Sequence, residues 1–226
     1  MLSAGAGQGL IEALQREFVA EGFEVDAGFY PVGVVADRLR AGEPCDAVVL
    51  TPARLDPLAR SGEVRGDSIV PLGDVHTAIA VREGQAPPDV STAAALKRAL
   101  LTADAIYVPD VERSTAGAHC AAMLRTMGIV AAVAARMQQR ANGVAAMQAL
   151  AQSREPHPVG CTQVTEIAIS PGVALVGSLP EPFALTTAYC VAVAAQARAP
   201  EHAARFAALL AGESSRELRR RCGFDL

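Results

Sequence analysis

The sequence predicts an α/β fold built around largely parallel β-sheets. Short β-like runs alternate with amphipathic helical stretches along the whole chain of 226 residues, which is the pattern of strands joined by crossover helices. Glycine follows several helical stretches, at Gly22, Gly42, Gly62 and Gly128, where it can end a helix. Hydrophobic residues make up 51% of the chain and aromatic residues 4%, so the core is expected to consist of aliphatic side chains.

In the first third of the chain, apolar spacing and the glycines that follow it set each element. Leu10, Ile11, Leu14 and Phe18 recur at helical spacing and predict an amphipathic helix that Gly22 ends. Strands are expected at residues 1–6, 24–30 and 46–50, and short helices at 34–42 and 55–61.

The rest of the chain continues the alternation. Strands are expected at residues 76–82, 105–108, 159–161, 173–176 and 186–195, and helices at 91–102, 116–127, 143–152, 165–169, 200–210 and 214–222. Ser91 and Asn142 are predicted N-caps, because their side chains can accept a hydrogen bond from a first-turn amide. The run Arg219–Arg221 is expected to be a solvated helix end, where the helix dipole favours positive charge.

Composition and charge narrow the function classes. The formal net charge of −4 argues against a nucleic-acid-binding protein, which usually has a basic surface, although backbone dipoles can still hold an anion. No apolar run reaches the roughly 18 residues of a membrane-spanning helix, and residues 1–9 lack the pattern of a signal peptide. The chain as it stands predicts a cytoplasmic protein without membrane insertion, or a periplasmic one from which a leader was removed.

Cysteine and histidine give no metal signature. The five cysteines are scattered without a C-x-x-C pair, so buried free thiols are expected in place of a zinc site or disulfide framework. The four histidines do not cluster in the sequence, and no Ser-His-Asp order, paired-carboxylate motif or P-loop stands out. The sequence predicts neither a metal site nor a cofactor.

Six segments carry a resemblance to a known family. The first three are LSAGAGQGLIEALQREFVAEGFEV, AGEPCDAVVLTPARLDPLARSGEV and AIAVREGQAPPDVSTAAALKRALL. The others are STAGAHCAAMLRTMGI, SLPEPFALTTAYCVAV and APEHAARFAALLAGESSRELRRRCGF. In this order they resemble the molybdate-type periplasmic binding proteins and their organic-anion-binding relatives, with Thr115 in place of a proline of that family. The likeness covers nearly the whole chain.

The resemblance implies a two-lobed, type II periplasmic-binding-protein-like fold. Each lobe is then a mixed, mainly parallel sheet flanked by helices, and two hinge crossings join the lobes. Residues 1–78 and 188–226 are expected to form lobe I, and residues 79–187 lobe II. A small anion is expected to bind in the cleft between the lobes and to drive hinge closure.

An oxyanion site without basic residues needs several backbone N–H groups that converge, and helix starts supply them together with a favourable dipole. The first candidate start contains Gly7, Gln8 and Gly9. The glycines let a ligand approach the backbone closely, and Gln8 adds a neutral donor. The alternative is a strand-to-helix turn that needs glycine only for steric reasons.

The second candidate start contains Tyr30, Val32 and Gly33. Family members that bind molybdate carry serines in these first two turns, whereas this chain has Gly9 in one and Val32–Gly33 in the other. The loss of two hydroxyl donors argues against molybdate, and the extra room and the phenol of Tyr30 favour a larger organic anion. The alternative is that Tyr30 packs at a lobe surface.

The third candidate start gathers hydroxyls, amides and a guanidinium in Arg113, Ser114, Thr115, Ala116 and Gly117. Here Arg113 is placed to bind a carboxylate with two parallel hydrogen bonds. The alternative is an ordinary Ser/Thr cap beside a solvated arginine.

The fourth candidate start is Asn142 and Gly143, with Arg140 beside it, and the alternative is a simple N-cap. Thr162 and Gln163 add side-chain donors, and Gln163 stands where the family has a ligand-contacting tyrosine. Glu166 is expected to support the fold or the cleft rim, because it would repel an anion.

The sequence supports two function classes and, at a lower rank, a third. The first is a solute-binding protein that captures a small oxyanion, either molybdate-like or an organic carboxylate, of which the carboxylate is favoured, and delivers it to an ABC permease if exported. The second is an isomerase of a small polycarboxylate, similar to aconitate isomerase, with Tyr30, Glu166 or His119 as the base. The third is a ligand-sensing module, which ranks last because no helix-turn-helix signature is present.

Overall fold

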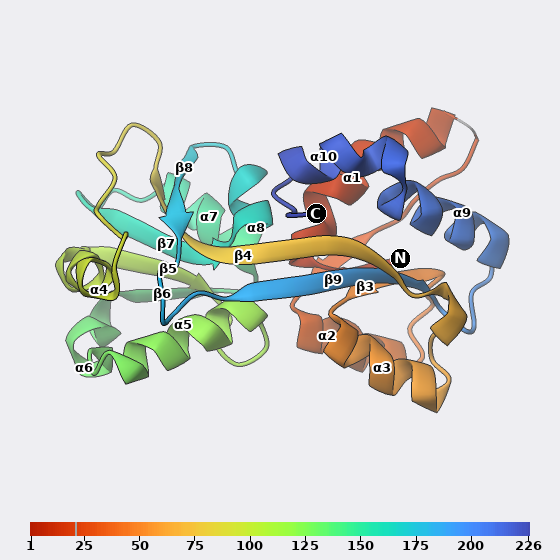
Figure 1. The fold of residues 1–226 in the computed structure, drawn as a ribbon, viewed down its shortest axis with the longest axis horizontal. Coiled ribbons are helices and arrows are strands. Elements are labelled where there is room, and N and C mark those ends of the chain that lie inside the picture. The colour runs from red at the N-terminus through yellow and green to blue at the C-terminus, as the bar shows by residue number, and fades with distance from the viewer. Residues whose placement is uncertain (21) are drawn as a thin grey trace. The chain divides into compact units, whose positions relative to one another are not determined.

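The computed structural model describes residues 1–20 and 22–226, and its strands and helices alternate along the chain (Figure 1). The strands are β1 Leu2–Ala4, β2 Gly28–Tyr30, β3 Ala47–Leu50, β4 Val70–Arg82, β5 Ala105–Pro109, β6 Met137–Arg140, β7 Pro158–Gln163, β8 Val173–Ser178 and β9 Thr186–Val193. The α-helices are α1 Gln8–Ala20, α2 Val32–Arg40, α3 Pro52–Ser61, α4 Ala93–Thr102, α5 Thr115–Thr126, α6 Val130–Val133, α7 Gly143–Ala151, α8 Val164–Ala168, α9 Pro200–Ala211 and α10 Arg216–Arg221. The predicted α/β class is confirmed.

The chain divides into two compact units. Unit 1 contains Met1–Val75 and Thr187–Leu226, and unit 2 contains His76–Thr186. The chain leaves unit 1 within β4 and returns to it at the start of β9. Each unit therefore has its own group of strands and its own set of helices.

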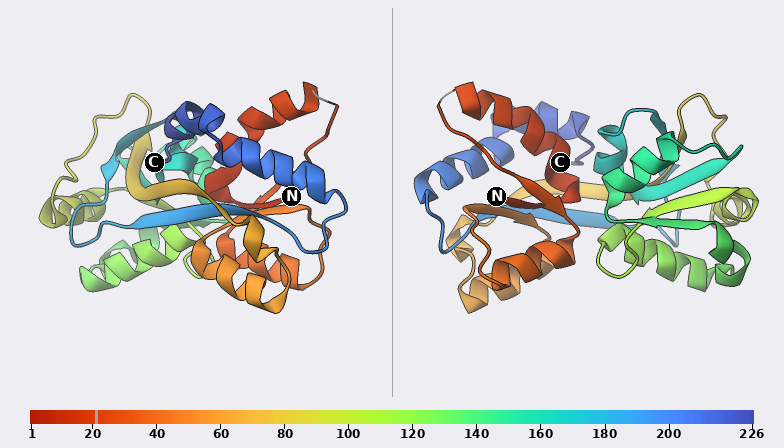
Figure 2. Two further views of the ribbon diagram at one scale, coloured as in Figure 1. Left: turned by 45° about the vertical axis from the view of Figure 1, so that its right-hand side comes forward. Right: turned by 180° about the vertical axis from the view of Figure 1, so that it is seen from behind.

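The sheet of unit 1 has the strand order β2-β1-β3-β9. Strand β1 pairs in parallel with β2 and β3, and β9 pairs antiparallel with β3. Helices α2 and α3 lie on one side of this sheet, and α1 and α9 lie on the other (Figure 2). Apolar side chains from all four helices are buried in one core with the sheet, which explains the helical spacing of Leu10, Ile11, Leu14 and Phe18.

In unit 2, β5 pairs in parallel with β6 and β7, and β4 pairs antiparallel with β7 and β8. Two cores lie on the two faces of this sheet. Leu96 of α4 and Met123 of α5 belong to one core, and Met147 of α7 and Ile167 of α8 belong to the other. The sheet is thus covered on both faces, as parallel strands require.

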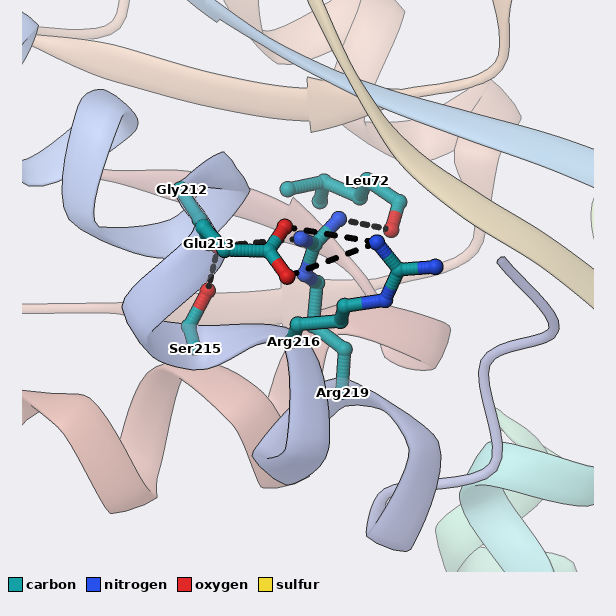
Figure 3. Close-up of polar contacts among 6 residues, drawn as sticks. All are labelled: Leu72, Gly212, Glu213, Ser215, Arg216 and Arg219. Carbon is teal, nitrogen blue, oxygen red and sulfur yellow. Dashed lines mark hydrogen bonds and ion pairs between the residues drawn. The ribbon is translucent and has the colours of Figure 1, made fainter.

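The run Arg219–Arg221 differs from its predicted role. Arg219 is only 7% exposed, and its guanidinium donates to the carbonyl of Leu72 at 2.9 Å and to that of Gly212 at 3.0 Å (Figure 3). Arg220 and Arg221 are exposed. The expected solvated helix end is therefore wrong for Arg219, because its planar fork satisfies two backbone carbonyls inside unit 1.

Other differences lie at element boundaries. The N-cap of α4 is Thr92, whose hydroxyl accepts from the amide of Ala95 at 3.1 Å, whereas the predicted cap Ser91 bonds Asp89. Asn142 caps α7 as predicted, through the amide of Ala145 at 2.8 Å. Neither β6 nor α6 was predicted, because both are short and lack a clear apolar period.

Two further features are the state of the cysteines and the length and apolarity of the helices. All five cysteines are free and buried, as predicted. Across residues 1–20 and 22–226, no single helix is long and apolar enough to cross a membrane, and α5 with residues 130–136 meets that criterion only as a pair bent by 119°.

Candidate functional site

In unit 1, three parallel strands end at the same edge of the sheet. Because β1, β2 and β3 are parallel, the first turns of α1, α2 and α3, the next α-helix after each strand, meet at this edge. We call these strand ends, the turns that connect them to the helices and the first helical turns the unit 1 edge. It contains all six residues predicted for this half of the site: Gly7, Gln8, Gly9, Tyr30, Val32 and Gly33.

The first turn at the unit 1 edge is held by packing within the protein. Gly7 is buried, and a Cβ on it would lie 2.6 Å from the hydroxyl oxygen of Ser3, so its glycine is required by packing. The Gln8 side chain donates to Glu12 at 2.8 Å. Gly9 is half-buried at the second position of α1.

Tyr30 lies at the unit 1 edge by its backbone, but its ring turns back along β2. The phenol oxygen is 2.8 Å from the position that a Cβ on Gly28 would take, and the Arg38 guanidinium lies 4.0 Å from the ring centroid. Arg38 also pairs with Glu43 at 2.8 Å. This stack holds the phenol over Gly28, two residues before the strand end.

The start of α2 offers unused backbone donors. Pro31 precedes the helix without a side-chain cap, and in the described part of the chain neither the Val32 nor the Gly33 amide has a hydrogen-bond acceptor. The first amides of a helix carry partial positive charge. This pair is therefore available to an anion.

In unit 2, β5, β6 and β7 are parallel, so their carboxyl ends also meet at one edge, followed by the first turns of α5, α7 and α8. We call these strand ends, the turns that connect them to the helices and the first helical turns the unit 2 edge. It contains all eight residues predicted for this half of the site: Arg113, Ser114, Thr115, Ala116, Gly117, Asn142, Thr162 and Gln163.

The start of α5 is partly capped and partly open. The Ser114 hydroxyl accepts from the amide of Gly117 at 3.4 Å, and a Cβ on Gly117 would overlap the carbonyl of Asp110. Among the residues described, the amides of Thr115 and Ala116 have no acceptor, although Ala116 is 1% exposed. Buried amides of this kind usually have a partner, so this pair is the strongest anion-binding feature of the unit 2 edge.

The start of α7 is already occupied by a side chain of the protein. Asn142 caps the amide of Ala145, and the Glu166 carboxyl accepts the amide of Gly143. Thr162 donates its hydroxyl to Glu166. Thr162 and the start of α7 thus donate to the buried carboxyl of Glu166. The residue types alone did not predict this internal use of the donors.

Two arginines give the unit 2 edge a cationic character. Arg140 ends β6, lies 5.6 Å from the Tyr107 ring centroid, and donates to the carbonyl of Gln139 at 2.8 Å. Within residues 1–20 and 22–226, no carboxylate forms a salt bridge with it. Arg113 is exposed, and its backbone amide donates to Asp110 at 2.9 Å. Arg140 therefore carries a cation that a ligand carboxylate can neutralise.

Sequence reasoning did not name Thr51, and it named Arg140 only as a neighbour of the fourth candidate helix start. Thr51 precedes α3 at the unit 1 edge and makes no side-chain cap, and its signal was only its place between an apolar strand and Pro52. His119, a candidate base, has its ring Nε2 2.8 Å from the carbonyl of Phe183. The part of the chain that the structure describes contains no group of three or more His, Cys, Asp or Glu able to hold a metal ion.

Comparison with known proteins agrees with this architecture. A family model described as bacterial extracellular solute-binding protein matches residues 2–225. An aconitate isomerase of a Pseudomonas species is 29% identical over 223 residues, which are 95% of this chain and 82% of that protein.

Two solved structures share the fold at low sequence identity. The periplasmic molybdate-binding protein of Azotobacter vinelandii has a TM-score of 0.78 and 15% identity, over 100% of this chain and 97% of that one. L-Phospholactate-bound PEB3, a Campylobacter jejuni protein, has a TM-score of 0.70 and 13% identity, over 100% and 98%. The chain therefore belongs to the bacterial extracellular solute-binding protein family and has the two-lobed, type II periplasmic-binding-protein fold that its sequence predicts.

Proposed function

We propose that this protein binds a small organic carboxylate through open backbone amides at its helix starts. The open amides of Thr115 and Ala116 carry this proposal, because they are unused donors at a helix start and Ala116 is buried. The amides of Val32 and Gly33 provide a second pair. Open amides of this kind suit an oxyanion, whether inorganic or organic.

Two features favour a carboxylate over molybdate or sulfate. Arg140 has no acidic partner among the described residues, and a guanidinium matches the planar geometry of a carboxylate. The first turns of α1 and α2 present Gly9, Val32 and Gly33, which contribute no hydroxyl to a tetrahedral oxyanion. The relative named aconitate isomerase and the L-phospholactate-bound structure point to the same ligand class.

We further propose that the protein acts in the periplasm and delivers its ligand to an ABC permease. Membership of the extracellular solute-binding family supports this location. A binding protein of this kind works by a population shift between open and closed states.

A thermal-shift screen tests the ligand class. Molybdate, tungstate, sulfate and small di- and tricarboxylates would be added separately, and a ligand that binds only the folded state raises the melting temperature. We expect stabilisation by di- or tricarboxylates. Stabilisation by molybdate and tungstate alone would contradict the proposal.

Arg140→Gln refines this test. Because the variant removes one charge-assisted carboxylate contact, we expect the affinity for the best carboxylate to fall by about tenfold or more. Arg125→Gln is the matched control, since Arg125 is exposed in the last turn of α5, at the other end from the unit 2 edge. Equal affinities of the two variants would remove Arg140 from the site.

An isomerase of a small polycarboxylate is the second candidate function, favoured by the 29% identity to a protein named aconitate isomerase. A base would take a proton from carbon and return it at another carbon of the same ligand. Incubation with cis- and trans-aconitate, followed by proton NMR, separates the two functions. Conversion establishes the isomerase, and tight binding without conversion leaves the binding protein.

A further inference from the structure

Glu166, in the first turn of α8, carries a carboxyl group inside unit 2. The residue is 6% exposed. Its carboxyl accepts the hydroxyl of Thr162 and the backbone amides of Gln163 and Gly143. A Cβ on Gly143 would overlap both the Glu166 carboxyl and the Thr162 hydroxyl. Glycine at position 143 therefore leaves the room that the Glu166 carboxyl occupies.

Neutral groups alone surround this carboxyl on the elements that pack against α8. Helix α7 and strands β7 and β8 contact α8. Among α7, α8, β7 and β8, the titratable residues are Glu166 and Cys161. Cys161 belongs to the core on the other face of the sheet, where its thiol meets that of Cys120. Beyond these elements, the guanidinium of Arg140 lies over Tyr107 of β5.

We infer that Glu166 takes up a proton when an anion binds at the unit 2 edge. When Glu166 is ionised, its negative charge weakens the binding of an anion at this edge. The inference rests on the proposed function. Its geometric basis is that Thr162 and Gln163, which bond the carboxyl, are themselves predicted ligand residues, and that Gly143 follows the predicted contact Asn142. An anion bound there lies close to a carboxyl that no cation on the neighbouring elements neutralises.

The sign of the effect follows from linkage. Burial raises the pKa of Glu166 above its ordinary value of 4.5, and the three hydrogen bonds offset part of that rise. A bound anion raises the pKa further, because like charges disfavour ionisation. Binding and protonation then favour each other equally. Anion affinity should fall with rising pH between the free and bound pKa of Glu166, by up to about tenfold per pH unit.

The test is calorimetric titration with tricarballylate, a tricarboxylate without a double bond, in buffers of different ionisation enthalpy. Proton uptake would be measured against pH for the wild type, Glu166→Gln and the control Glu155→Gln, since Glu155 is an exposed acid of the same unit. Ionisation of the ligand itself is common to all three proteins. We expect wild type and Glu155→Gln to take up more protons than Glu166→Gln, by up to one per ligand, and Glu166→Gln to lose this pH dependence.

Two outcomes separate this inference from the proposed function. Binding with equal proton uptake in wild type and Glu166→Gln would overturn the role of Glu166 and leave carboxylate binding intact. No binding at any pH would overturn both. If Glu166→Gln does not fold, carbon-13 NMR of the wild-type Glu166 carboxyl replaces it, and a pKa that tricarballylate leaves unchanged overturns the inference.

Discussion

Glycines at three strand-to-helix turns leave room for other groups of the protein. Gly7, Gly117 and Gly143 all follow strands, where glycine permits close approach of another group. The group that approaches is the Ser3 hydroxyl at Gly7, the Asp110 backbone at Gly117 and the Glu166 carboxyl at Gly143. Packing within the protein therefore requires glycine at each of these turns.

Gly143→Ala tests the residue-scale account. The added methyl would overlap the Glu166 carboxyl and the Thr162 hydroxyl, so we expect the free energy of unfolding to fall by about 1–3 kcal/mol, measured by urea denaturation. Gly177→Ala is the control in the same unit, because its Cβ would meet its nearest neighbour, Val90, at 3.7 Å. Equal stability of the two variants would show that the α7 turn accommodates a side chain.

At the scale of elements, apolar periodicity predicted most helices and strands. It did not predict features that depend on polar side chains. Strand β4 begins at Val70, before the predicted start at His76, since Pro71 and Gly73 hide its period. Strand β6 was missed because it consists of Met137, two glutamines and Arg140. The Arg219 anchor of α10 was missed for a related reason, because a run of arginines is normally solvated.

Arg219→Ala tests this anchor. The guanidinium satisfies the carbonyls of Leu72 and Gly212, and burial lowers its pKa. Because truncation leaves two acceptors without this donor and opens a cavity, we expect a loss of about 2–4 kcal/mol in unfolding free energy. Arg220→Ala, at an exposed neighbour, should change stability by less than about 0.5 kcal/mol. Similar losses in both would mean that α10 depends on general charge and not on this anchor.

At the scale of the whole molecule, the chain brings helix starts from distant segments to two sheet edges. The alternation of elements and the six family-like segments predicted this fold, because parallel strands place their following helices at one edge. All fourteen predicted site residues lie at these edges. Which donors stay open was not predictable, because the internal use of Thr162 and Gly143 by Glu166 depends on side-chain packing between α7 and α8.

Backbone amide NMR tests the central claim most directly. Proton–nitrogen spectra of the labelled protein would be recorded during titration with the carboxylate that stabilises it most. We predict the largest shifts at the amides of Val32, Gly33, Thr115 and Ala116, which have no acceptor among the described residues. Unchanged resonances at these four amides, with shifts gathered at other residues, would contradict the account.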